Sequence, residues 1–103
     1  MNLTVVGIGL IGGSMALALK ESGFAQTVIG VDNRPEHIVK ALELRLVDKV
    51  LLLPDAIRQS DVVILATPVD SLLTLLPQVL DQVENQIVIE VGSTKKLVVE
   101  SVK

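Results

Sequence analysis

The sequence contains no cysteine, no tryptophan and no tyrosine, and Phe24 is its only aromatic residue. Without cysteine the chain forms no disulfide, no zinc–thiolate site and no thiol nucleophile, which fits a reducing compartment. The near absence of aromatic rings removes the stacking platforms that bind single-stranded nucleic acid. Half of the residues are apolar, so we expect a folded domain with an almost purely aliphatic core.

Basic runs and long hydrophobic runs are also missing. Binding to nucleic acid depends on cationic neutralisation of phosphates, and the formal net charge is -3, so no nucleic-acid partner is expected. The apolar runs are about five residues long, well below the ~20 residues of a membrane-spanning helix. The first strand-like run starts at Asn2 and leaves no room for a signal peptide. No metal-ligand spacing occurs. We therefore expect a soluble, cytoplasmic protein.

Strand-like apolar runs alternate with stretches of helical period, which predicts a parallel sheet covered by helices on both faces. Residues 62–65 are apolar at every position, as in a parallel strand buried on both sides. We predict a doubly wound α/β fold of the Rossmann type, with strand order 3-2-1-4-5 and a ligand site between strands one and four. The predicted strands are 2–8, 27–31, 49–53, 61–66 and 86–91; the predicted helices are 11–22, 35–46, 67–81 and 95–103, with a turn or short helix at 54–59.

A glycine-rich turn with the spacing Gly-x-Gly-x-x-Gly lies between the first strand and the first helix. Gly7 lets the chain turn sharply off the strand, Gly9 leaves room for a pyrophosphate, and Gly12 lets the helix approach the sheet. The phosphates would meet the N–H groups at the start of the helix and the positive end of its dipole. The predicted pyrophosphate site comprises Gly7, Gly9, Leu10, Ile11, Gly12 and Gly13. A purely structural turn is the alternative.

An acidic residue follows the second strand, twenty residues after Gly12. At this position Asp32 can accept hydrogen bonds from the hydroxyls of an adenosine ribose, and its charge would repel a 2'-phosphate, which favours NAD over NADP. Arg34 complicates this preference, because an arginine just after the acid could pair with a 2'-phosphate. Together with Asn33 they form the predicted ribose-binding segment. The alternatives are a turn formed by Asp32, Asn33 and Pro35, and a solvated surface charge at Arg34.

Other polar residues at the same sheet edge are weaker candidates. Ser14, just inside the first helix, could reach a phosphate oxygen, or it could simply be a small residue at the contact between helix and sheet. Ala66, Thr67 and Pro68 follow the fourth strand, so their backbone would border the nicotinamide end of a cofactor. The Thr-Pro sequence equally suits a helix start, with a Thr cap and Pro in the first turn.

His37 is the only histidine, and it lies early in the second predicted helix beside Glu36 and Lys40. A catalytic histidine needs an orienting partner and access to the substrate. Nothing in the sequence places His37 near the switch point. We therefore interpret it as a solvated surface residue.

Three segments together resemble the prephenate/arogenate dehydrogenase family. They are Gly7-Ile8-Gly9-Leu10-Ile11-Gly12-Gly13-Ser14, Ala66-Thr67-Pro68-Val69 and Val91-Gly92-Ser93-Thr94-Lys95. In that family hydride passes from C4 of the prephenate ring to NAD(P)+ while the ring loses CO2 and becomes aromatic. A histidine accepts the ring hydroxyl proton, and a serine in a Gly-Ser-x-Lys segment hydrogen-bonds this site. The resemblance implies that this serine is Ser93; on spacing alone, a helix cap explains it.

The resemblance also implies parts that these 103 residues do not contain. The family's histidine belongs to a Gly-Gly-His-Pro segment, which is absent, and His37 does not match it. The helical substrate and dimerisation domain is likewise missing. We therefore expect residues 1–103 to be a single truncated N-terminal dinucleotide-binding domain, inactive alone, of an NAD-dependent prephenate dehydrogenase of tyrosine biosynthesis, a homodimer at full length.

Three other functions remain open at this point. Arogenate could replace prephenate as substrate, because the groups that distinguish the two would lie beyond these residues. The chain could belong to another small-acid dehydrogenase, such as a relative of hydroxyisobutyrate or imino-acid reductases. It could also be a non-catalytic domain that senses a nucleotide and shifts the equilibrium of a partner.

Overall fold

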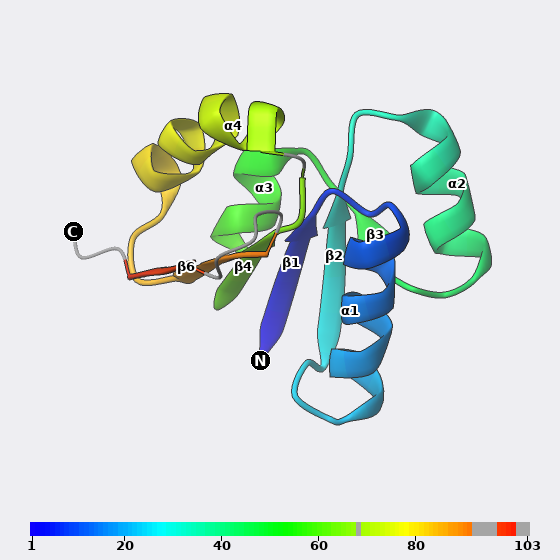
Figure 1. The fold of residues 1–103 in the computed structure, drawn as a ribbon. Helices are drawn as coiled ribbons and strands as arrows, with labels where there is room; N and C mark the ends of the chain where they lie inside the picture. Colours follow the sequence, from blue (N-terminus) through cyan, green and yellow to red (C-terminus); the bar gives the residue numbers. More distant parts are fainter. Residues whose placement is uncertain (68, 92–96, 101–103) are drawn as a thin grey trace.

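The computed structural model describes residues 1–67, 69–91 and 97–100. Strands and helices alternate over most of the chain (Figure 1). The elements are β1 (Asn2–Val6), α1 (Leu10–Glu21), β2 (Thr27–Val31), α2 (Pro35–Glu43), β3 (Lys49–Val50), α3 (Leu53–Arg58), β4 (Val62–Leu65), α4 (Val69–Gln82), β5 (Ile87–Glu90) and β6 (Leu97–Glu100).

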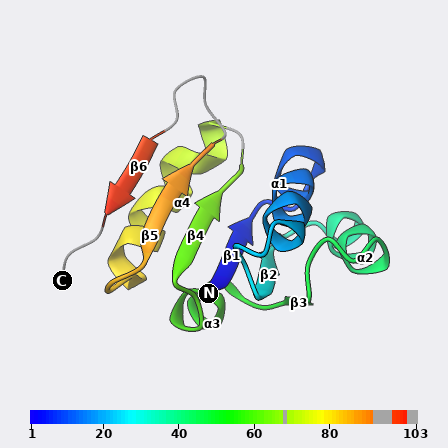
Figure 2. The ribbon, with the colours of Figure 1, turned by 90° about the horizontal axis from the view of Figure 1, so that it is seen from below.

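The strands form one sheet in the order β3-β2-β1-β4-β5-β6 (Figure 2). The first five strands in this order are parallel, so the predicted order 3-2-1-4-5 is confirmed. Strand β1 is central, and it pairs with β2 on one side and with β4 on the other. The switch point of the fold therefore lies between β1 and β4, where parallel sheets of this kind bind their ligands.

The prediction of a helix over residues 95–103 is wrong for the described part of that segment. Residues 97–100 form β6, which runs antiparallel to β5, with Leu97 opposite Glu90 and Glu100 opposite Ile87. Two of the four residues of β6 are valines, whose branched side chains favour a pleated strand over a helix. The free edge of β5 decides the conformation, because pairing there satisfies backbone groups that would otherwise remain open.

The sheet is buried on both faces, as its apolar strands predict. In β4, Val62 and Ile64 belong to the hydrophobic cluster that includes residues of α1 and α2. Val63 and Leu65 point the other way and belong to the cluster that includes residues of α3 and α4. Helices therefore cover both faces, and the doubly wound α/β class is confirmed. No helix in the described residues is long and apolar enough to span a membrane.

Backbone hydrogen bonds fix the loops at the carboxyl ends of the strands. The Gly7 N–H donates to the Val31 carbonyl at 2.8 Å, and the Ala66 N–H donates to the Val6 carbonyl at 2.8 Å. These bonds continue the sheet ladder by one residue past β1 and β4. The loops after β1, β2 and β4 are consequently held side by side at one edge of the sheet.

Candidate functional site

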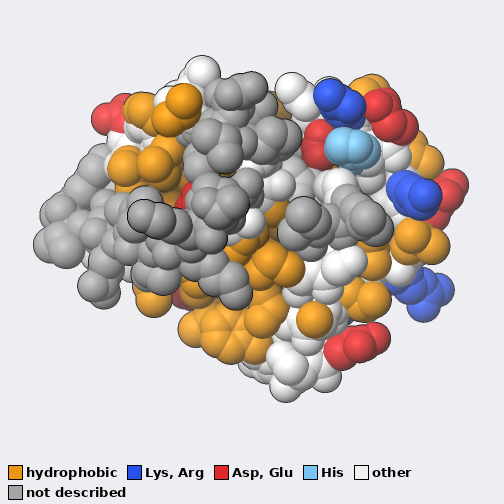
Figure 3. All heavy atoms as spheres, viewed as in Figure 1, with side chains coloured by type: hydrophobic (Ala, Val, Ile, Leu, Met, Phe, Trp, Pro, Cys, Tyr) orange, Lys and Arg blue, Asp and Glu red, His pale blue; other side chains and the backbone are white. Residues whose placement is uncertain are grey.

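A cavity of about 1150 Å³ opens at this edge of the sheet. Its walls come from the loops after β1, β2 and β4, from the segment before α3, and from one face of α4. Near α2 the surface carries charged side chains of both signs (Figure 3). Eight of the predicted cofactor-binding residues line the cavity, namely Gly7, Gly9, Gly12, Asp32, Asn33, Arg34, Ala66 and Thr67.

The glycine loop begins with a turn that favours glycine. Gly7 has a φ of 90°, in the left-handed region that other residues rarely adopt. A Cβ atom on Gly7 would also lie 2.9 Å from Cγ2 of Thr67 and 3.0 Å from the carbonyl oxygen of Ala66. The chain therefore turns sharply after β1, directly against the loop that follows β4.

The other two glycines of the motif differ in what surrounds them. A Cβ atom on Gly12 would lie 2.0 Å from the carbonyl oxygen of Gly7, so the first turn of α1 packs directly on the loop. A Cβ atom on Gly9 would meet only His37, at 3.6 Å from Cε1, which is an ordinary contact. Packing within the domain thus requires glycine at position 12 but not at position 9. The open space beside Gly9 belongs to the cavity.

The N-terminus of α1 presents backbone donors to this space. Gly9 is the N-cap residue, and no side chain caps the helix there. The Gly13 N–H donates to the Gly9 carbonyl at 2.8 Å. The N–H groups of residues 10–12 precede that bond, and the first N–H groups of a helix have no partner within the helix. Together with the helix dipole they provide an anion-binding end without any basic side chain.

Asp32 follows β2, and its side chain is only 6% exposed. Its Oδ1 accepts a hydrogen bond from the Arg34 N–H at 2.9 Å, and its Oδ2 accepts one from the Ile8 N–H at 2.9 Å. Burial by itself would raise the pKa of Asp32, but these bonds and the neighbouring His37 outweigh it and hold the pKa below its usual value. Asp32 is therefore an ionised carboxylate at neutral pH. The bond from the Arg34 N–H, two residues further on, is that of the turn which the sequence offered as the alternative interpretation of Asp32.

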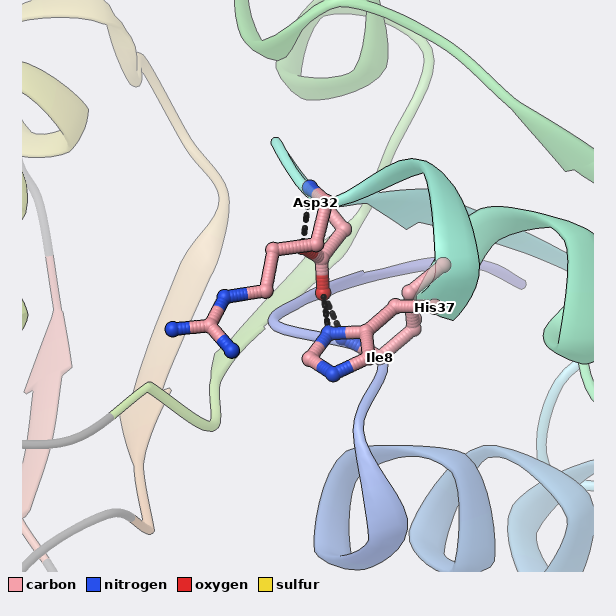
Figure 4. Close-up of polar contacts among 4 residues, drawn as sticks. Ile8, Asp32 and His37 are labelled. Atoms are coloured by element: carbon pink, nitrogen blue, oxygen red, sulfur yellow. Dashed lines mark hydrogen bonds and ion pairs between the residues drawn. The ribbon is translucent and has the colours of Figure 1, made fainter.

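The His37 side chain is 34% exposed, so it is partly solvated as predicted, but the expectation that nothing places it near the switch point is wrong. His37 lines the cavity, and its Nδ1 lies 2.9 Å from Oδ2 of Asp32. Figure 4 shows the imidazole and the carboxylate pointing toward each other beside the Ile8 N–H. His37 is the third residue of α2, and the turn after β2 brings that first helical turn back over Asp32. In the sequence, the five-residue spacing between Asp32 and His37 across a turn was the signal that could have indicated this contact.

Thr67 contributes a buried polar atom to the wall after β4. Its Oγ1 is shielded from solvent and has no hydrogen-bond partner within the described part of the chain. Buried hydroxyl groups in folded proteins are normally paired. Since Thr67 lines the cavity, a bound ligand could supply the missing partner.

Several predicted residues do not lie at the cavity or are not described. Ser14 is exposed and is absent from the cavity wall, and Gly13 packs toward Leu46 instead. The side chains of Leu10 and Ile11 lie outside the described part of the structure, as do Pro68 and the predicted catalytic Ser93.

Sequence reasoning also missed the wall formed by α4. Thr74, Leu75 and Gln78 line the cavity, as do residues 51–53 before and at the start of α3. Thr74 and Gln78 are spaced four residues apart and share one face of the helix. This polar pair on a largely apolar helix was a usable signal. No group of three or more potential metal ligands occurs in the described residues.

The fold and the cavity together define a Rossmann-type α/β domain with its ligand site at the switch point. Comparison with known families identifies it further. The family described as "Prephenate dehydrogenase, nucleotide-binding domain" matches residues 15–103. The chain belongs to this family, which confirms the family resemblance stated from the sequence.

Known relatives agree with this assignment. Prephenate dehydrogenase of Bacillus subtilis (strain 168) is 37% identical over 96% of this chain, and that of Lactococcus lactis subsp. cremoris (strain MG1363) is 31% identical over 96%. The chain spans 28% of the length of each of these curated relatives.

Two solved structures share the fold closely. Synechocystis arogenate dehydrogenase has a TM-score of 0.80 and 32% identity, covering 92% of this chain and 34% of that one. Prephenate dehydrogenase from Aquifex aeolicus, in complex with hydroxyphenyl propionate and NAD+, has a TM-score of 0.78 and 29% identity, covering 87% of this chain and 32% of that one.

Proposed function

We propose that this chain is the NAD-binding domain of a prephenate dehydrogenase. The observation that carries the proposal is the cavity in which the glycine loop, the start of α1 and the Asp32 carboxylate meet. Its volume of about 1150 Å³ exceeds the ~300–1,000 Å³ typical of pockets for smaller ligands and suits an extended dinucleotide.

Three features of the cavity fit the parts of a dinucleotide. The pyrophosphate would lie on the N–H groups of residues 10–12, in the space that the missing side chain of Gly9 leaves open. The adenosine ribose would lie on Asp32. The nicotinamide end would lie beside Thr67, whose buried hydroxyl has no partner within the described residues. By resemblance to the family, Pro68 and Ser93 would also belong to this part of the site. Ser14 is exposed and outside the cavity wall, so we do not propose it as a phosphate contact.

The charge at the end of β2 supports NAD rather than NADP. Asp32 is buried and ionised, because hydrogen bonds hold its pKa below the usual value despite burial. A 2'-phosphate beside such a carboxylate would be repelled. Asn33 and Arg34 border the same end of the cavity, and the Arg34 guanidinium carries a permanent positive charge.

When bound, NAD+ would accept the hydride that prephenate loses during its oxidative decarboxylation to 4-hydroxyphenylpyruvate. The chain's own residues would hold the dinucleotide and orient its nicotinamide end. By resemblance to the family, Ser93 would be the serine that hydrogen-bonds the reacting site. The proton acceptor would come from a Gly-Gly-His-Pro segment that these 103 residues do not contain. We therefore propose that the chain alone does not turn over prephenate, and that the complete enzyme is a cytoplasmic homodimer with a helical substrate domain.

Arogenate dehydrogenase is the second candidate. The TM-score of 0.80 to the Synechocystis arogenate dehydrogenase favours it as an alternative within the same family. The substrates differ in their side chains, which the dinucleotide site does not contact. Both functions use the same cavity in the same way.

The cofactor assignment is tested by replacing Asp32 with asparagine. Asp32→Asn removes one charge while keeping the side-chain shape, and hydrogen bonds to a charged group contribute about 1.5–3 kcal/mol. We expect isothermal titration calorimetry to show saturable binding of NAD+ to the wild type with weaker binding of NADP+. In the variant, NAD+ should bind about tenfold more weakly, which corresponds to ~1.4 kcal/mol, and the preference over NADP+ should shrink.

Asp48 provides the matched control. It lies beside the opposite end of β2, accepts a hydrogen bond from the Val28 N–H at 2.8 Å, and does not line the cavity. Burial alone would raise its pKa, yet the Lys20 ammonium and the Val28 N–H hold the pKa below the usual value, as at Asp32. Asp48→Asn should leave both affinities unchanged. Equal binding of NAD+ by wild type and Asp32→Asn would remove the ribose assignment.

A further inference from the structure

The Asp32 carboxylate has less free hydrogen-bonding capacity than a ribose-binding aspartate needs. A carboxylate offers about four acceptor positions. Three are taken here, by the Arg34 N–H, the Ile8 N–H and His37 Nδ1. An aspartate that accepts both the 2'- and the 3'-hydroxyl needs two free positions, and only one remains. The two backbone donors are fixed by the loops, so the His37 bond is the one that can change.

The hydrogen-bond pattern fixes which edge of His37 faces the cavity. An ionised carboxylate only accepts hydrogen bonds, so Nδ1 of His37 carries the hydrogen in the bond to Asp32. The opposite edge of the ring lies near Gly9: a Cβ atom built there is 3.6 Å from Cε1 and 4.0 Å from Nε2. The ring therefore stands between the ribose-binding carboxylate and the space left open for the pyrophosphate.

Four charged residues lie around His37. Asp32 faces it directly, Arg34 lines the same end of the cavity, and Glu36 and Lys40 are exposed neighbours on α2. A hydrogen bond from the imidazole draws negative charge density of Asp32 toward His37. The repulsion between Asp32 and a 2'-phosphate is then weaker than an unpartnered carboxylate would give.

From these contacts we infer that His37 is a specificity-determining residue of the dinucleotide site. It occupies one acceptor position of Asp32 that a ribose hydroxyl would otherwise take, and it shields the carboxylate from a 2'-phosphate. Both effects reduce the preference for NAD over NADP. The inference rests on the proposed function, because it assumes that a dinucleotide binds with its ribose at Asp32.

Two substitutions test the role of the His37 hydrogen bond. His37→Ala removes both the hydrogen bond and the shielding, so NAD+ should bind at least as tightly as to the wild type and NADP+ more weakly. We expect the dissociation constant for NADP+ divided by that for NAD+ to rise about tenfold. His37→Gln retains a neutral donor that can occupy Asp32, so NAD+ affinity should stay near the wild-type value while the ratio rises less than in the alanine variant.

Lys40→Ala is the matched control, because it removes a full positive charge from the same helix at an exposed position away from the cavity wall. The measurement is calorimetric titration of all four proteins with NAD+ and NADP+, with thermal unfolding to verify folding. An unchanged ratio in both His37 variants would overturn the inference while leaving NAD binding intact. An equal rise in Lys40→Ala would also overturn it, since overall charge would then be the cause. A wild type that binds neither dinucleotide would overturn the proposed function itself.

Discussion

Replacing Gly12 by alanine is expected to destabilise the domain by at least about 3 kcal/mol, toward the upper end of what overpacking costs. The new Cβ atom would lie 2.0 Å from the Gly7 carbonyl oxygen, and 3.2 Å from the Cβ atom of Ala66. The oxygen is backbone and is held by the turn that begins at Gly7, so it cannot rotate away. Helix α1 would have to move off the sheet, with loss of its contacts to β1 and β2.

The neighbouring glycine supplies the control for this experiment. In Gly13→Ala the new Cβ atom would meet Cδ1 of Leu46 at 2.7 Å, which is the end of a flexible side chain that can turn aside. Alanine is also a better helix former than glycine by roughly 0.5–1 kcal/mol, which offsets the adjustment. Chemical denaturation of both variants measures the difference. Similar free energies of unfolding for Gly12→Ala and Gly13→Ala would show that the close contact at Gly12 is not a packing constraint.

Replacing Gly9 by alanine should act differently from Gly12→Ala. We expect little loss of stability and a large loss of NAD binding. Gly9 has a φ of -75° and a ψ of -158°, which alanine adopts readily. The new methyl group would make only an ordinary contact with His37. Alanine is a poorer N-cap than glycine, so we expect a cost of no more than ~1 kcal/mol in the free energy of unfolding.

The same methyl group would project into the cavity where the pyrophosphate would bind. We expect the affinity for NAD+ to fall at least about 100-fold, which corresponds to ~2.7 kcal/mol. Thermal unfolding and calorimetric titration of the one variant give both quantities. If Gly9→Ala binds NAD+ like the wild type, the pyrophosphate does not lie over Gly9, and the proposed orientation of the dinucleotide is wrong.

Most of the fold could be predicted because its signals are local and repeated. The uninterrupted apolar run in β4 indicated a strand buried on both faces, and the alternation of strands and helices then restricted the order of the sheet. The prediction for residues 95–103 failed because the conformation of that segment depends on pairing with β5. The valines of β6 pair with β5, and nothing within residues 95–103 shows that this edge is available. The β3 strand is also shorter than predicted, since α3 begins at Leu53 with Pro54 in its first turn.

The parts of the candidate site that are fixed by the glycine loop and its spacing could be predicted from the sequence. The glycine spacing placed Gly7, Gly9 and Gly12 at the cavity, and the distance from Gly12 placed Asp32 there as well. His37 was missed because helical position alone indicates which face a residue lies on, not how the preceding turn directs that face. The α4 wall was missed for a related reason. Thr74 and Gln78 indicate a polar face of this helix, but where that face lies depends on how the helix packs over the sheet.

The most direct test of the account is a titration of the 103-residue chain with NAD+ followed by backbone amide NMR. Binding should shift the amide signals of residues 7–13, 32–34 and 66–67, which belong to the loops after β1, β2 and β4. Signals at the opposite edge of the sheet, such as those of Gly23 and Gln59, should remain in place. Saturable shifts confined to the first group would support dinucleotide binding at the switch point. No shifts, or shifts centred elsewhere, would contradict it.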